Sequence, residues 1–139
     1  MKQYQTIRKR RGSAGQSLVE FALVLPIFLL IFLGVVDFGR AIYTKHILDK
    51  AAREAARAGA VRVDEAEAIQ TARTAATNVL TSLHMNSETQ VDVNVVNVNG
   101  APAISVSTRL PFSSFFTTGQ FAIIKNLTLT SNVTMRKEG

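Results

Sequence analysis

One acidic residue lies inside a long apolar run near the start of the chain. Glu20 falls within Leu18–Val36, where no other residue carries a charged or polar side chain. An acid costs about 2.5–3.5 kcal/mol near the centre of a bilayer by insertion scales, and less toward its edge. Such a carboxylate is retained when it has a role, and pairing with a cation in a low-dielectric environment is a favourable one. We therefore interpret Glu20 as a docking group whose partner comes from another protein.

The other reactive residue types show no pattern of catalysis or metal binding. The chain has no cysteine, and its two histidines, His46 and His84, lie far apart in sequence and outside any ligand motif. Three acids cluster at Asp64, Glu65 and Glu67, where the start of a helix explains them. No phosphate-binding loop or nucleophile motif occurs. We expect no enzyme activity, no metal site and no cofactor.

The positive charge is confined to one end of the chain. The net charge is +6, and five basic residues precede Gly12: Lys2, Arg8, Lys9, Arg10 and Arg11. From Gln16 onward, eleven basic residues face ten acidic ones. No aromatic residues are interleaved with the basic cluster to stack on bases. The distribution argues against nucleic acid as a partner.

The apolar run has the length of a membrane-spanning helix. Its 19 residues extend ~28 Å at 1.5 Å per residue, close to the ~30 Å of a hydrocarbon core. The basic residues Arg8, Lys9, Arg10 and Arg11 predict a cytoplasmic N-terminus, with the chain after Asp37 on the other side. Pro26 removes one backbone donor, so we expect a kink there.

Three kinds of membrane segment fit this run to different degrees. A cleaved secretory signal has a shorter apolar core, followed by an A-x-A-like site. The residues that follow this run, VVDFGRAIYTK, contain no such site. A plain signal anchor explains the length and the flanking charge, but leaves Glu20 unexplained. A segment cut on the cytoplasmic side of the run accounts for the basic leader, Gly15, Glu20 and the intact apolar helix together.

The helical pattern continues beyond the membrane to about Ala60. A stripe of small and apolar residues comprises Ile47, Leu48, Ala51, Ala52, Ala55, Ala56 and Ala58. The opposite side carries Lys45, Asp49, Lys50, Arg53, Glu54 and Arg57. Asp49 and Arg53 have the favourable i,i+4 order for an ion pair. Gly59 is a plausible end signal, so we predict one helix from Leu18 to about Ala60.

The remaining chain predicts a second helix and three strands. Asp64 and Glu67 fit a capping box, followed by an apolar stripe of Ile69, Ala72, Ala76, Val79, Leu80 and Leu83. Strand alternation begins at Val91 and changes phase at Val95–Val96, which suggests a bulge. Asn99-Gly100 is a strong hairpin signal. The further strands contain Ile104, Val106, Thr108 and Leu110, and then Leu127, Leu129, Ser131, Val133 and Met135. The predicted fold class is α+β, with a three-stranded antiparallel sheet covered by the helices.

Two stretches of the chain resemble the TadE-like family of tight-adherence (Flp-type) pilus systems, pseudopilins related to type IV pilins. They are GQSLVEFALVLPIFLLIFLGVVDFGR, from Gly15 to Arg40, and LDKAAREAARAGA, from Leu48 to Ala60. The first contains the G-x-x-x-x-E-aromatic order at Gly15, Glu20 and Phe21. The closing LTLTSNVTMRKE is also similar, but more weakly.

The resemblance implies a pilin-like fold and a route of assembly. A prepilin peptidase would cut between Gly15 and Gln16, so that Glu20 would become the fifth mature residue. In pilins, an acid at this place lies against the terminal amine of an adjacent subunit. Phe21 and Pro26 would belong to the same assembly segment. The implied partners are the membrane, the peptidase, other pilin or pseudopilin subunits, and the assembly platform.

These observations predict three parts: a basic cytoplasmic leader (1–15), a transmembrane segment (16–36) and an extracytoplasmic helix-plus-sheet domain (37–139). Major pilins of this system are often little more than the helix, so the domain indicates a minor, pilin-like subunit. We expect it in the cytoplasmic membrane of a bacterium, as a single-pass protein that enters a surface pilus. The alternative is an uncleaved scaffold or anchor of the pilus or secretion apparatus.

Overall fold

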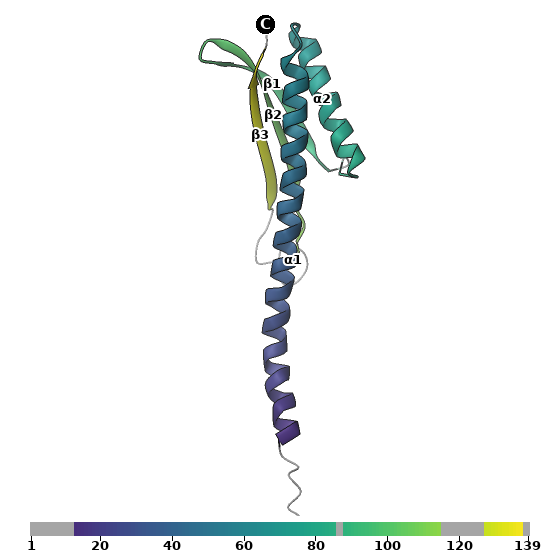
Figure 1. Ribbon diagram of the computed structural model, residues 1–139, viewed down its shortest axis with the longest axis vertical. Helices are drawn as coiled ribbons and strands as arrows, with labels where there is room; N and C mark the ends of the chain where they lie inside the picture. Colours follow the sequence, from purple (N-terminus) through teal and green to yellow (C-terminus); the bar gives the residue numbers. More distant parts are fainter. Residues whose placement is uncertain (1–12, 86–87, 115–126, 138–139) are drawn as a thin grey trace, which may run out of the picture. The chain divides into compact units, whose positions relative to one another are not determined.

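The computed structural model describes residues 13–85, 88–114 and 127–137. In chain order the elements are α1 (Ser13–Ala60), α2 (Glu65–Ser82), β1 (Gln90–Val98), β2 (Ala101–Pro111) and β3 (Thr128–Arg136) (Figure 1). The predicted α+β class, with one long helix, a second helix and a three-stranded sheet, is confirmed. The chain divides into two compact units between Val36 and Asp37. We call the second unit the domain.

Helix α1 begins earlier than predicted and continues through its proline. It starts at Ser13 instead of Leu18, because the polar residues before the apolar run also adopt helical geometry, which hydrophobic periodicity does not detect. Pro26 lies inside the helix; the kink there stays a prediction. The helix ends at Ala60 as expected, but Gly59 is not a left-handed end signal, since Gly100 is the positive-φ glycine among the described residues.

Helix α2 begins with half of the predicted capping box. Asp64 is the N-cap, with extended backbone angles (φ −69°, ψ 135°), and its carboxylate accepts the Glu67 backbone N–H at 2.9 Å. The Glu67 side chain pairs with Arg62 at 2.9 Å, so the reciprocal arm of the box is replaced by an ion pair. The buried face of α2 is formed by Ala68, Ala72, Ala76 and Leu80.

The sheet is an antiparallel meander in the order β1-β2-β3. Its first hairpin turns at Asn99 (φ 52°) and Gly100 (φ 79°), the positive φ values of a type I′ turn. The register runs without interruption through Val95↔Ile104 and Val96↔Ala103, so the predicted bulge at Val95–Val96 is wrong. The change of phase has a simpler reason: Val96 follows the pleat onto the face away from the core side chains.

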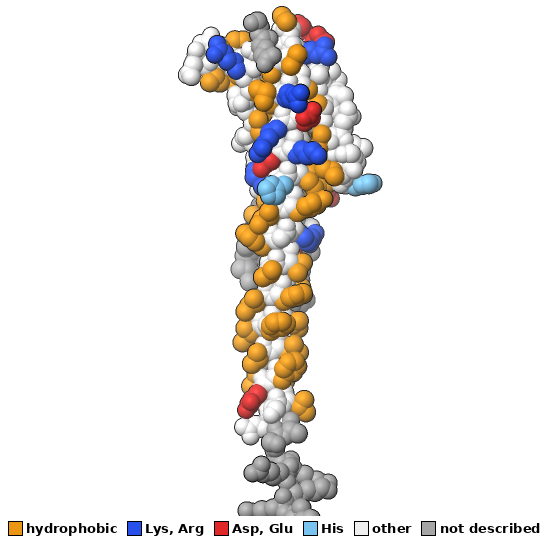
Figure 2. All heavy atoms as spheres, in the orientation of Figure 1, with side chains coloured by type: hydrophobic (Ala, Val, Ile, Leu, Met, Phe, Trp, Pro, Cys, Tyr) orange, Lys and Arg blue, Asp and Glu red, His pale blue; other side chains and the backbone are white. Residues whose placement is uncertain are grey.

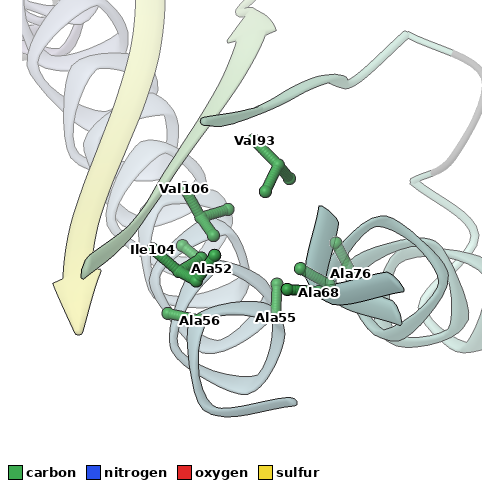
Figure 3. Packing of buried hydrophobic residues seen from close by; sticks show 9 residues of the cluster. Ala52, Ala55, Ala56, Ala68, Ala76, Val93, Ile104 and Val106 are labelled. Carbon is green, nitrogen blue, oxygen red and sulfur yellow. The ribbon is translucent and has the colours of Figure 1, made fainter. Parts of the chain in front are cut away.

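Both helices cover one face of this sheet with a core of small helix residues and larger strand residues (Figure 3). The cluster contains Ala52, Ala55 and Ala56 from α1, Ala68, Ala72 and Ala76 from α2, and Val93, Ile104 and Val106 from the strands. Ala58, predicted in the stripe, is only partly buried, whereas Ala60 is buried. Alanine side chains let the backbones of two helices approach closely. The distance between α1 and α2 therefore depends on the small size of these residues.

Gly59 lies where this approach is tightest. A Cβ atom at Gly59 would lie 3.0 Å from the Ala68 carbonyl oxygen and 3.1 Å from the Ala72 Cβ. The carbonyl belongs to the backbone of α2 and cannot rotate away. Gly59 is therefore retained for close packing, a role that the sequence alone does not reveal.

We expect Gly59→Ala to lower the free energy of unfolding by about 1 kcal/mol, because overpacking outweighs the gain in helix propensity. The matched control is Gly39→Ala in the same helix, where an added Cβ meets nothing within 4 Å. There the helix-propensity gain of about 0.5–1 kcal/mol should appear alone. Thermal or denaturant unfolding of the full chain in detergent measures both. Equal stabilisation by the two substitutions would contradict the close-packing role.

Candidate functional site

The stretch Leu18–Val36 of α1 presents its large apolar side chains outward. Leu18, Phe21, Leu23 and Val35 are among those at least 60% exposed. Figure 2 shows hydrophobic side chains along the visible face of this stretch. Within the described residues, α1 is the one helix long and apolar enough to cross a membrane. Such a surface requires a covering of lipid or of other apolar helices.

Glu20 lies on this exposed surface one helical turn after Gln16. The Gln16 side-chain amide donates a hydrogen bond to a Glu20 carboxylate oxygen at 3.2 Å. The i,i+4 spacing places the two side chains next to each other on the helix. The predicted assembly residue therefore contacts the residue on the C-terminal side of the predicted cut. The i,i+4 spacing of Gln16 and Glu20 is the sequence feature from which this hydrogen bond could have been predicted.

Gly15 and Gln16 lie in the first turns of α1. Because α1 begins at Ser13, the Gly15–Gln16 peptide bond has helical geometry in the structure. An added Cβ at Gly15 would meet nothing within 4 Å. The absence of packing there means that the local chain opens without disturbing a core. Whether the bond is cut stays a prediction.

Phe21 and Pro26 lie within the same apolar surface. Phe21 is 63% exposed and borders a wholly apolar hollow that is also lined by Val24, Leu25 and Phe28. Further along, Phe28 stacks on Phe32 with ring centroids 6.4 Å apart. A hollow of this kind can accept an apolar side chain. The basic residues Arg8, Lys9, Arg10 and Arg11 lie outside the described residues, so membrane orientation stays a prediction.

The charged side of α1 in the domain differs from the prediction in its pairing. Asp49 forms an ion pair with Lys45 at 3.2 Å, in place of the predicted direct pair with Arg53. Lys45 also donates to the backbone carbonyl of Thr130, and Asp49 is hydrogen-bonded to Ser131. These bonds attach β3 to α1. Lys45 and Arg53 are both four residues from Asp49, so the contacts with β3 distinguish the two candidate partners where the spacing does not.

Burial by itself would raise the pKa of Asp49, but the surrounding groups outweigh it. The Ser131 and Lys45 hydrogen bonds, together with the charges of Lys45 and Arg53, hold the pKa of Asp49 below its usual value. Each of these groups favours the ionised carboxylate. The network therefore makes a contribution to stability that depends on pH.

The site combines a single acid with an exposed apolar surface. Among the described residues, no group of three or more His, Asp or Glu side chains is placed to hold a metal ion. The acid of interest has an amide hydrogen-bond donor beside it and apolar side chains around it. Chemically, a carboxylate in an apolar setting favours pairing with a cation.

One N-terminal helix of sufficient length and hydropathy, followed by an α+β domain, fits a single-pass membrane protein. The family model described as "TadE-like protein" matches residues 15–57. The predicted resemblance to the TadE-like family is thereby confirmed over this stretch. A search of curated proteins and a search of solved structures give no match. The matched residues include Glu20 and most of α1, whereas α2 and the sheet lie beyond them.

The Asp49 network predicts a defined pH dependence of stability. A carboxylate whose pKa is lowered by folding stabilises the protein above its unfolded pKa of about 3.9, and this contribution disappears as the pH falls through the folded pKa. Asp49→Asn should therefore flatten the dependence of the unfolding free energy on pH between about 5 and 3. The effect should stay below ~1 kcal/mol, because both side chains of the pair are partly exposed.

Denaturant unfolding of the full chain in detergent at several pH values measures this effect. Asp92→Asn is the control. It makes the same substitution at a half-exposed acid, whose ion-pair partner Arg109 lies 3.8 Å away. A pH slope in Asp49→Asn identical to that of the unsubstituted chain would rule out the role given to the network.

Proposed function

We propose that this protein is a minor, pilin-like subunit of a tight-adherence pilus, processed by a prepilin peptidase and inserted through its apolar helix. The TadE-like match over residues 15–57 supports an association with this pilus system. The proposed role is assembly, without catalysis or a cofactor. The proposed partners are the membrane, the peptidase, neighbouring pilin or pseudopilin subunits and the assembly platform.

The observation that carries the proposal is the position of Glu20. It lies on an exposed apolar helix, five residues after Gly15, inside the segment that matches the family. A lipid anchor has no use for an acid there, because the charge makes insertion less favourable. A filament subunit does, since the acid can pair with a cation when the helix leaves lipid for a bundle of helices.

In the proposed route, cleavage between Gly15 and Gln16 creates a new amine at Gln16. Glu20 then pairs with the amine of an adjacent subunit and sets the axial position of the two helices. The surface from Leu18 to Val36 exchanges lipid for other apolar helices, so its side chains remain away from water throughout. The large domain beyond Val36 supports a minor subunit in preference to the bulk fibre protein.

A second candidate is an uncleaved scaffold or anchor of the apparatus. The observation that favours it is the helical geometry at Gly15–Gln16, because α1 already begins at Ser13. A peptidase acts on a locally extended bond, so this first stretch of helix would have to unwind. Terminal turns are the least stable part of a helix, which keeps cleavage compatible with the fold.

The first prediction is a peptidase-dependent mature start at Gln16. Intact mass and terminal sequencing of the protein from cells with and without the peptidase measure it. Gly15→Val should leave the full-length precursor in the membrane, because a larger side chain sits at the proposed cut. Gly39→Val is the control, a glycine with equally open surroundings further along the helix. A Met1 start in all samples would favour the anchor.

The second prediction concerns Glu20. Glu20→Gln keeps the size of the side chain and removes its charge, so processing should continue while recovery in sheared pili falls at least about tenfold. Glu54→Gln makes the same change at an exposed position of α1 in the domain and should have no effect. Normal piliation in the Glu20→Gln variant would contradict the proposed docking role of Glu20. An anchor would instead insert more readily and keep its function.

A further inference from the structure

Exposed apolar side chains continue on α1 past Val36 into the domain. Phe38, Ile42 and Tyr43 are 69%, 44% and 63% exposed. The other large apolar side chains exposed in the described part of the domain are Val61, Val63, Val98 and Met135, which lie in or beside turns and at a strand end. Two aromatic residues and an isoleucine within six positions therefore form a local concentration, which we call the collar.

The charged residues at the same level are arranged to favour contact with an apolar, anionic environment. Asp37 is buried and pairs with Arg40 at 3.5 Å, so its negative charge is withdrawn from the surface. The Arg40 guanidinium lies 5.8 Å from the ring centroid of the buried Phe112, while its side chain stays 60% exposed. No further acid occurs before Asp49. The large side chains that α1 exposes between Asp37 and Tyr43 are therefore aromatic, aliphatic and cationic.

We propose that the collar, with Arg40, binds the phospholipid headgroup region of the membrane that the apolar helix enters. This inference rests on the membrane insertion of Leu18–Val36 in the proposed function. At 1.5 Å per residue, Phe38 lies ~3 Å and Tyr43 ~10 Å beyond Val36 along the helix. The polar interface extends roughly 5–8 Å beyond the hydrocarbon core on each side, so the collar falls at this depth or at its edge.

The residue types fit this environment. Tyrosine is enriched at membrane interfaces because its ring is apolar and its hydroxyl is polar. Arginine keeps its stem along apolar surface while its guanidinium reaches the lipid phosphates. The Asp37–Arg40 pair keeps the acid in this zone away from those phosphates.

The distribution of the collar around the helix favours lipid over a second copy of the chain. Phe38 and Tyr43 are five residues apart, which places them ~140° from each other around α1. Phe38 and Ile42 are four residues apart and share one stripe, which a partner helix could cover, but Tyr43 lies outside that stripe. Lipid surrounds a helix from every open direction.

The chain contains no tryptophan, so a single substitution gives a unique fluorescent reporter. The experiment uses four single variants of the full chain: Phe38→Trp, Tyr43→Trp, Ile27→Trp within the apolar run and Arg53→Trp further along the domain. Each is reconstituted into vesicles of phosphatidylcholine and phosphatidylglycerol. Lipids with quenchers at the headgroup or deep in the acyl chain report depth, and acrylamide reports access from water.

We expect Phe38→Trp and Tyr43→Trp to be quenched most strongly from the headgroup level, with acrylamide quenching several-fold weaker than in Arg53→Trp. Ile27→Trp should respond to the deep quencher. If acrylamide reaches the collar as well as it reaches position 53 while Ile27→Trp is deep, the collar proposal fails and membrane insertion stands. A shallow or aqueous Ile27→Trp would instead refute the inserted helix. Shielding of the collar that grows with the protein-to-lipid ratio would assign it to a second copy and overturn the lipid assignment.

Discussion

Helix α1 has to satisfy two environments with one continuous backbone. Its first part carries large apolar side chains that remain exposed, including Leu23 and Phe28. From Thr44 onward, the same helix buries side chains, and most of these are alanine. Large side chains give lipid or neighbouring helices much apolar area to cover, whereas small ones admit a second backbone at close range. The change in residue size along α1 therefore separates the part whose apolar side chains stay exposed from the part that packs within the domain.

The alanine-rich contact also shapes how the domain is stabilised. Alanine buries little area, so strand residues such as Ile104 and Val106 supply most of the apolar volume at the interface. Polar bonds add fixed points: the Thr108 hydroxyl donates to the Leu48 carbonyl at 3.3 Å in a buried position. At the other end, Lys137 donates to the Val63 carbonyl at 2.8 Å, which ties the end of β3 to the turn between the helices. The sheet is thus fixed to α1, and the residue after β3 to the turn that follows α1.

Local features of the fold could be predicted from the sequence because each depends on neighbouring residues. The Asp64 N-cap, the Asn99-Gly100 turn and the alternation of the strands all follow from short-range geometry. The predictions for Asp49 and Gly59 were wrong because residues distant in sequence determine the pairing of Asp49 and the role of Gly59. Asp49 pairs with Lys45 because both also bond to β3, and Gly59 is explained by the backbone of α2.

The candidate segment shows the same limit. Its composition predicts a membrane helix and an anomalous acid, but local spacing does not encode which group would pair with Glu20. The bulge expected at Val95–Val96 is a related error, since a change of apolar phase in a strand can also mean that residues on the outer face are apolar. In both cases a pattern identifies an unusual residue, and only the surroundings say which explanation holds.

The bond from Gln16 to Glu20 clarifies what an external partner would have to add. A neutral amide satisfies one carboxylate oxygen but leaves the negative charge in place. In a low-dielectric bundle, the uncompensated charge is the larger part of the penalty. An amine on an adjacent subunit supplies the positive charge that Gln16 lacks, and under the proposed processing this amine exists only after cleavage. An uncut neighbour would present no such cation at Gln16, so a single charge pair would make assembly conditional on processing.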